Sequence, residues 1–135
     1  MREIKFRGRR VFIPHEWVYG SLLIDFESAD HDGRRITAIT YFDGFQRVAE
    51  VDPETVGQFT GLHDKYGKEI YEGDILGWMC GGVGQGDGTP AKSEVYFDRY
   101  KFAVRTGRTS FGWKLSQAAE VIGNIHENPE LLEDK

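Results

Sequence analysis

The chain has 135 residues, a formal net charge of −5 and 39% hydrophobic residues, which is enough for one domain or two small subdomains. This composition excludes a disordered protein, and no apolar run reaches the roughly 20 residues of a membrane helix. The single cysteine, Cys80, excludes an internal disulfide and fits a reducing compartment. The basic N-terminus has no apolar stretch of signal-peptide type behind it, so we expect a cytoplasmic protein.

The first third of the chain alternates apolar and polar residues, the pattern of half-buried strands. Within the second predicted strand, Gly20 is a candidate bulge, and "GRR" at 8–10 predicts a turn. Asp-Gly pairs at 32–33 and 43–44 are hairpin signals. Antiparallel strands are therefore predicted at 3–7, 17–26, 36–42 and 45–51.

The middle of the chain predicts strands joined by tight corners. Pro53 ends the preceding strand, and Asp52 can cap a single turn after it. Alternation then resumes at 56–62. Gly67 suits a turn that requires a positive φ, and the segment from Ile70 onward returns to a buried run.

The last third begins with a glycine-rich loop at 81–90. Asn128 and Pro129 predict a capped turn near the C-terminus. Between these features, composition predicts a short helical turn at 116–119 and strands at 93–98, 101–106, 111–115 and 121–125.

Four stretches of the sequence resemble the YopX family of bacteriophage and prophage proteins. They are "MREIKFRG", "EWVYGSLL", "VDPETVGQFTGLHDKYGKEIYEGDIL" and "EVIGNIHENPEL", in that order from Met1 to Leu132, with variable stretches at 27–45 and 80–116 between them. The resemblance implies an uncharacterised function. It also implies an SH3-like β-barrel in the C-terminal half, preceded by a small N-terminal β-rich (α+β) portion. We therefore expect a mainly β fold with subdomains at 1–54 and 55–135.

The segment 59–78 admits two interpretations, an acid–base site or a tightly turned piece of β-structure. A site requires Glu69, Glu72 and Asp74 to converge on a cleft, with at least one pKa shifted by burial. The structural interpretation is favoured, because carboxylates in turns usually accept backbone N–H bonds. In this interpretation, Tyr71, Ile75 and Trp78 fill the interior, and Gly67 and Gly73 permit the bends. The carboxylates of Asp64 and Asp74 accept backbone N–H bonds in the turns.

A basic stretch at 99–114 is a candidate nucleic-acid-binding surface, since it contains five cations, several aromatics and no acid. Alternation places Lys101 and Ala103 opposite Tyr100 and Phe102, so the aromatics should face the core. The overall acidic charge also opposes binding to phosphates. The candidate residues are Arg99, Lys101, Arg105, Arg108 and Lys114.

No cofactor or metal is predicted. The 81–90 loop lacks the lysine and hydroxyl residue of a phosphate-binding loop. Cys80 has no histidine close in sequence to activate it, which favours an inert thiol. The four histidines lack metal-ligand spacing: His15, His31, His63 and His126.

These observations favour a non-enzymatic phage or prophage accessory protein that acts through protein–protein contacts. We expect a homo-oligomer, most commonly a dimer, because small β proteins expose strand edges that can pair with a neighbour. The candidate edges are 95–98 and 120–125. A phage or host protein is a possible further partner, nucleic acid is a less favoured one, and a membrane is not expected.

Overall fold

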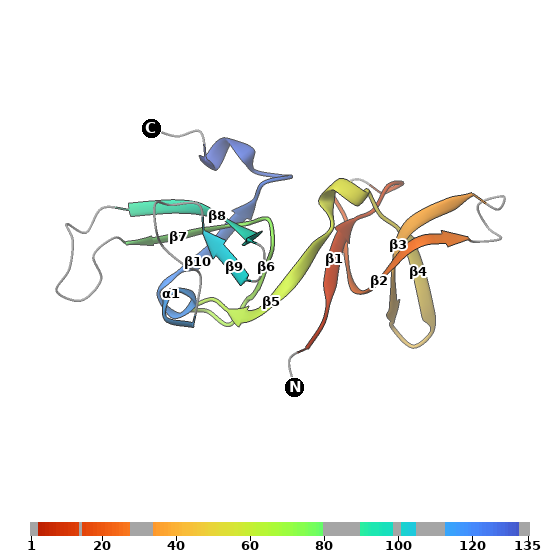
Figure 1. Cartoon of the computed structure of the whole chain (residues 1–135), viewed down its shortest axis with the longest axis horizontal. Coiled ribbons are helices and arrows are strands. Elements are labelled where there is room, and N and C mark those ends of the chain that lie inside the picture. Colours follow the sequence, from red (N-terminus) through yellow and green to blue (C-terminus); the bar gives the residue numbers. More distant parts are fainter. Residues whose placement is uncertain are drawn as a thin grey trace. The chain divides into compact units, whose positions relative to one another are not determined.

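The computed structural model describes residues 3–13, 15–27, 34–79, 90–98, 101–104 and 113–132. The chain divides into two compact units, Met1–Phe59 and Thr60–Lys135 (Figure 1). The sequence placed the boundary slightly earlier, at 54/55. The division falls inside a strand, β5, which begins in the first unit and ends in the second.

Strands make up nearly all regular structure of the first unit. They are β1 (Phe6–Arg9), β2 (Trp17–Glu27), β3 (Arg35–Phe42), β4 (Gln46–Glu50) and β5 (Gly57–His63), and β2 and β3 are rich in the β-branched and aromatic residues that favour strands. Their antiparallel ladder runs in the order β4-β3-β2-β1-β5 and continues to β6. A 3₁₀ turn, η2 (Pro53–Thr55), precedes β5, and Asp52 caps it as predicted, since its side chain accepts from the Glu54 N–H.

The second unit contains β6 (Glu69–Tyr71), β7 (Asp74–Met79), β8 (Pro90–Asp98), β9 (Lys101–Val104) and β10 (Glu120–Asn124). Four of these strands form an antiparallel sheet in the order β10-β7-β8-β9. A short helix, α1 (Trp113–Ala118), precedes β10, and a 3₁₀ turn, η3 (Pro129–Leu132), follows it. Within the described part of the chain, β9 and β10 each pair with one neighbour, so no closed barrel forms there.

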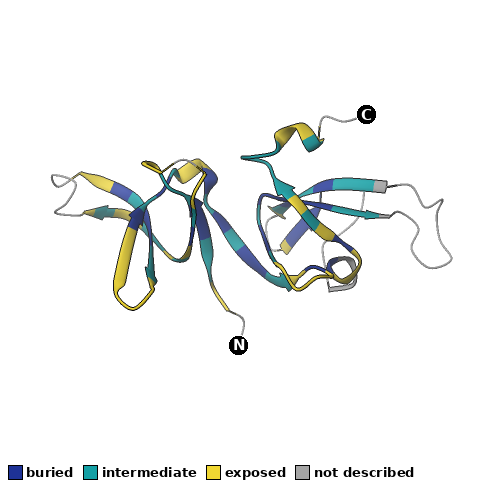
Figure 2. Cartoon of the chain, turned by 180° about the vertical axis from the view of Figure 1, so that it is seen from behind, coloured by how far each residue is buried: buried dark blue, intermediate teal, exposed yellow. Residues whose placement is uncertain are grey.

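Each unit has its own hydrophobic core (Figure 2). In the first unit the core is Val18, Ile39, Ala49 and Val51, which face one side of the β2–β3–β4 sheet. In the second it is Ile70, Leu76, Val95, Phe102, Val104 and Ala119. The mainly β prediction is confirmed. The α+β character implied by the family resemblance is not seen among the described residues of the first unit, which contain no α-helix.

Three local predictions are wrong. Residues 113–118 are helical where 111–115 was predicted as a strand, because Lys114, Leu115 and Gln117 favour a helix. Gly20 is not a bulge, since the register of β2 on β3 shifts between Leu23 and Phe26 instead. The turn predicted at 8–10 is strand, because β1 runs to Arg9 and Arg10 bridges to Val51.

The two predicted sheet edges have different outcomes. Residues 95–98 belong to β8, which lies between β7 and β9, so they are not an edge. The strand β9 pairs with the side of β8 that was predicted to be an unpaired edge. Residues 120–124 form β10, which does end its sheet.

Candidate functional site

The segment with the strongest sequence signal, 59–78, folds into a strand, two tight turns and two further strands. Asp64 lies at the end of β5, and 4% of its surface is exposed. Its Oδ1 accepts from the N–H groups of Tyr66 and Lys68, both at 2.9 Å, and its Oδ2 accepts from the Val121 N–H at 2.9 Å. One carboxylate therefore closes a turn and joins that turn to β10, far along the chain.

The charge state of Asp64 follows from these contacts. Burial raises the pKa of this carboxyl, but the three backbone N–H bonds lower it by more, so the pKa lies below its usual value of 3.8. The ionised carboxylate is thus the form that the fold stabilises. A low pKa suits a structural acceptor and does not suit a general acid at neutral pH.

Glu69 and Asp74 are also engaged in local structure. Asp74 is 1% exposed and its Oδ2 accepts from the Tyr71 N–H at 2.8 Å. Glu69 Oε1 accepts from the Tyr71 hydroxyl at 2.8 Å. The predicted use of Asp64 and Asp74 as backbone acceptors is therefore confirmed.

The predicted roles of the glycines and apolar residues in this segment hold as well. Gly67 and Gly73 have φ values of 87° and 93°, which an L side chain rarely adopts. Tyr71 and Ile75 are buried, and Trp78 packs against the core of the second unit. The arrangement positions strands; it does not bring Glu69, Glu72 and Asp74 together on a described cleft.

The basic stretch 99–114 is only partly described. Lys101 is exposed on β9, and Phe102 is buried and meets Phe97 edge-on at 5.1 Å, so this aromatic faces the core as predicted. Ala103 is buried too, although alternation placed it with Lys101. Lys114 lies in α1, and the remaining candidates, Arg99, Arg105 and Arg108, lie outside the described residues. Whether these five cations share one surface therefore remains a prediction.

The histidines that the structure describes lie apart from one another. His15, His63 and His126 lie in separate turns or strand ends, and the described residues contain no cluster of metal-ligating side chains. Cys80 and residues 81–89 lie outside the described part of the chain, as does His31. No helix among the described residues is long and apolar enough to cross a membrane.

A surface that the sequence did not single out lies on the hairpin between β3 and β4. Phe42 and Phe45 are 73% and 70% exposed at its tip, and Val48 is 46% exposed on β4. Tyr19 is also exposed and lies on the same sheet face as Phe42, because Ser21 pairs with Thr40, Tyr19 precedes Ser21 by two residues and Phe42 follows Thr40 by two. We call Tyr19, Phe42, Phe45 and Val48 the hairpin patch; Figure 2 shows this hairpin largely exposed.

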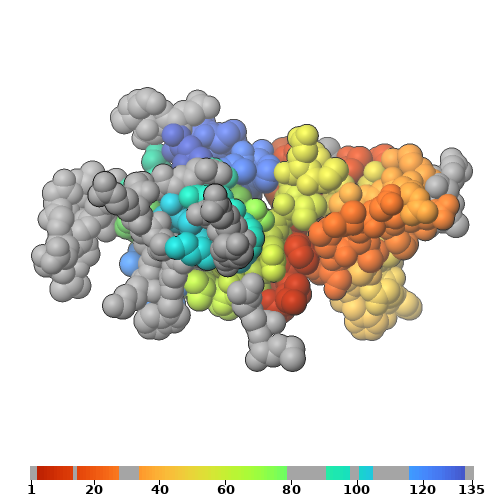
Figure 3. Space-filling model, in the orientation of Figure 1, coloured from red at the N-terminus to blue at the C-terminus, as the bar shows by residue number. Residues whose placement is uncertain are grey.

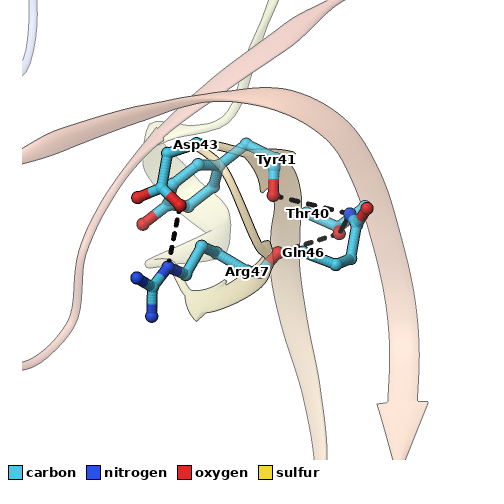
Figure 4. A network of polar contacts seen from close by, with 5 residues as sticks. All are labelled: Thr40, Tyr41, Asp43, Gln46 and Arg47. Atoms are coloured by element: carbon cyan, nitrogen blue, oxygen red, sulfur yellow. Dashed lines mark hydrogen bonds and ion pairs between the residues drawn. The ribbon is translucent and has the colours of Figure 1, made fainter.

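A polar network holds the hairpin in one shape (Figure 4). The Arg47 guanidinium donates to Asp43 Oδ1 at 3.0 Å, and this hydrogen bond lowers the pKa of Asp43. The same guanidinium lies over the Phe45 ring. Gln46 Nε2 donates to the Thr40 hydroxyl and to the Tyr41 carbonyl. With Gly44 at a φ of 104°, the predicted Asp-Gly turn is confirmed, and its apolar side chains project from an ordered support.

The outer edge of β4 has backbone groups that face away from β3. Val51 N–H bonds to the Thr37 carbonyl, and hydrogen-bonded pairs alternate along an antiparallel ladder, so Arg47 and Ala49 bond to β3 in the same way. The N–H and C=O groups of Gln46, Val48 and Glu50 therefore point outward. The Val11 N–H binds the Glu50 carbonyl, which leaves the part around Val48 as the open edge.

Fold and surface together define a two-unit, mainly β protein with an ordered, exposed hairpin. The YopX protein family matches residues 14–133, and the chain belongs to this family. Among solved structures, it is similar to protein EF1440 from Enterococcus faecalis, with a TM-score of 0.61 and 25% sequence identity. That likeness covers 98% of this chain and 99% of EF1440. No curated protein matches the chain.

Proposed function

We propose that this protein is a non-enzymatic phage or prophage accessory protein that acts through protein–protein contacts, and that its first contact is with a second copy of itself along β4. The observation that carries this proposal is the open edge of β4 beside the hairpin patch. Exposed strand edges with apolar neighbours invite pairing with another strand. The phage or prophage origin is inferred from the family resemblance. The SH3-like barrel, which the same resemblance implies, remains a prediction.

The sequence of β4 suits pairing with its own copy about a twofold axis. With Val48 opposite Val48 of the second copy, the outward N–H and C=O groups of both residues form one hydrogen-bonded pair. The side chains of Gln46 and Glu50 then lie opposite each other, and because the Glu50 carbonyl already accepts from the Val11 N–H, the central backbone bonds come from the Val48 pair. Centring the pair on Arg47 would instead place two guanidinium groups opposite each other, which is unfavourable. Of these two registers, the one centred on Val48 is therefore favoured.

Association would also cover the hairpin patch. Val48 and Phe42 lie on one face of the sheet, since Thr40 pairs with Val48 and Phe42 with Gln46. Adding a second copy beside β4 makes this apolar face continuous across the axis. Figure 3 shows the light-orange atoms of the β3–β4 region projecting at the surface of the first unit.

Lysine at position 48 should break this contact, because it places two like charges opposite each other at the axis. We expect the Val48→Lys variant to raise the dissociation constant of the dimer by at least about tenfold. Sedimentation velocity across a wide concentration range measures the change. Wild-type protein should sediment as a dimer of the 15.4 kDa chain at micromolar concentration.

The matched control is Ile122→Lys, which alters an exposed aliphatic residue on β10, the open edge of the other sheet. This variant should leave association unchanged. Dissociation by Ile122→Lys and not by Val48→Lys would move the contact to β10 and overturn the proposal. A monomer at every concentration would remove it.

Nucleic-acid binding by the basic stretch 99–114 is the alternative outcome. It predicts a submicromolar complex with DNA or RNA that weakens steeply as salt rises and is lost on charge reversal at Arg105 and Arg108. We expect weak or no binding at physiological salt. A complex of that kind with a folded protein would replace the protein-contact proposal.

A further inference from the structure

The first unit contains a groove of about 900 Å³, within the size range of small-molecule sites. It lies where the end of β1, the last part of β2, the start of β3 and the link from β4 to η2 come together. Its walls combine apolar and charged side chains. They include Val11 and Ile24, which are exposed, and Arg10, Asp25, Arg35 and Glu50.

Two residues on the groove have an unusual backbone conformation. His15 and Asp25 have φ values of 67° and 58°, and in the described part of the chain they are the non-glycine residues with positive φ. Both line the groove. A left-handed conformation is uncommon for non-glycine residues, although Asp and His adopt it more often than most. Such residues cluster at active and binding sites.

The cations of the groove keep hydrogen-bond donors for a ligand. Arg10 binds Glu16 through Nη1 at 2.8 Å, and Arg35 binds the Asp25 carbonyl through Nη1 at 2.9 Å. A guanidinium has five N–H donors, so the Nε and Nη2 groups of both side chains can bind a planar or tetrahedral oxyanion.

The carboxylates of the groove are already engaged as acceptors. Asp25 forms an ion pair with Arg35 at 3.7 Å, and Glu50 binds Arg34 at 3.4 Å. Asp52 caps η2. Three arginines and three carboxylates line the groove, so its formal charges balance, and each of these carboxylates already has a cation or an N–H donor beside it.

From this geometry we propose that the groove binds a small organic oxyanion, a carboxylate or a phosphate ester, attached to an apolar body. The oxyanion is held by the guanidinium groups of Arg10 and Arg35. The apolar body lies against Val11 and Ile24, because a bare phosphate would fill only a small part of the volume and leave these side chains in water. This site is separate from the pairing of β4 and does not depend on it.

Titration followed by nuclear magnetic resonance tests the site, with phenyl phosphate and phenylacetate as the two oxyanion probes. Amide shifts should concentrate at Val11, Ile24 and Arg35. Comparing the two probes shows whether the site prefers phosphate or carboxylate. Inorganic phosphate should bind about tenfold more weakly than phenyl phosphate, since it lacks the apolar body.

Arg35→Ala should weaken binding of the preferred probe about tenfold, because it removes the charge-assisted hydrogen bonds that the guanidinium group donates to the oxyanion. Arg35→Lys keeps the charge and should recover only part of the affinity. The matched control is Arg47→Ala, which removes a similarly exposed arginine from the hairpin and should change affinity less than about twofold.

Phenethylamine serves as the cationic counterpart of the same probes. Equal or tighter binding of phenethylamine would show that the carboxylates dominate the groove and would overturn the proposal. So would the absence of groove shifts with either oxyanion, or unchanged affinity in a folded Arg35→Ala protein. Because Arg35 is largely exposed, the Arg35→Ala variant should fold. If it does not, the affinity of the Arg35→Lys variant provides the same test.

Discussion

Replacing Asp64 with alanine should destabilise the second unit by about 4 kcal/mol, since three backbone N–H groups lose a buried, charged acceptor. Asp64→Asn should cost about 2 kcal/mol, because an amide presents only one acceptor oxygen to the same N–H groups. Hydrogen exchange at the amides of Tyr66, Lys68 and Val121 measures the loss at the bonds themselves.

The effect of Asp64 should depend on pH in a defined direction. Its pKa in the folded protein lies below 3.8, so its stabilising contribution is present above that pH and is lost as the pH falls through the folded pKa. The difference between wild type and Asp64→Asn should therefore shrink in strong acid. Glu120→Gln, an exposed neighbour of Val121, is the control and should exchange as wild type does. Normal protection of Val121 in Asp64→Ala would contradict the role given to this carboxylate.

Gly20→Ala should destabilise the first unit by about 3 kcal/mol, because a Cβ at this position would overlap the Thr40 carbonyl on the neighbouring strand. That Cβ would also lie 3.1 Å from the Thr40 carbonyl carbon and 3.2 Å from Tyr41 Cβ. Backbone atoms in a paired strand cannot yield as a flexible side chain can. Faster exchange at the amides of Leu22 and Ile39 reports the loss.

Gly77→Ala provides the matched control, since this glycine also lies in a strand. Its added Cβ would meet the flexible side chain of Ile122 at 3.4 Å, an ordinary contact. The substitution should change stability by less than about 1 kcal/mol. Equal effects at the two glycines would show that the close approach of β2 and β3 at Thr40 is not the cause.

Local chemistry made much of the fold predictable from the sequence. Turns at Asp43-Gly44 and around Gly67 follow from residues whose preferences are nearly independent of context. The cap at Asp52 and the acceptor roles of Asp64 and Asp74 follow in the same way. In each of these cases the decisive contact includes a partner within four residues.

The errors arise where distant segments decide the outcome. The sequence predicts a bulge at Gly20, but glycine is required there because the Thr40 carbonyl on the neighbouring strand leaves no room for a Cβ. Whether 95–98 is an edge depends on where β9 pairs. The groove and the hairpin patch were missed for the same reason, since their residues come from several strands and share no sequence motif. Exposure of Phe42 and Phe45, in particular, is not visible in an alternation pattern.

The most direct measurement of the proposed contact is disulfide cross-linking of Val48→Cys in a Cys80→Ser background. In the proposed register the two Val48 Cα atoms lie about 5.5 Å apart, within the range that a disulfide spans. Arg47→Cys is the control, because position 47 lies opposite Ala49 and is about 7–8 Å from its own copy. We predict that Val48→Cys forms a disulfide-linked dimer on mild oxidation and that Arg47→Cys remains largely a monomer. No cross-link at position 48, or equal cross-linking at both positions, would contradict self-association through β4.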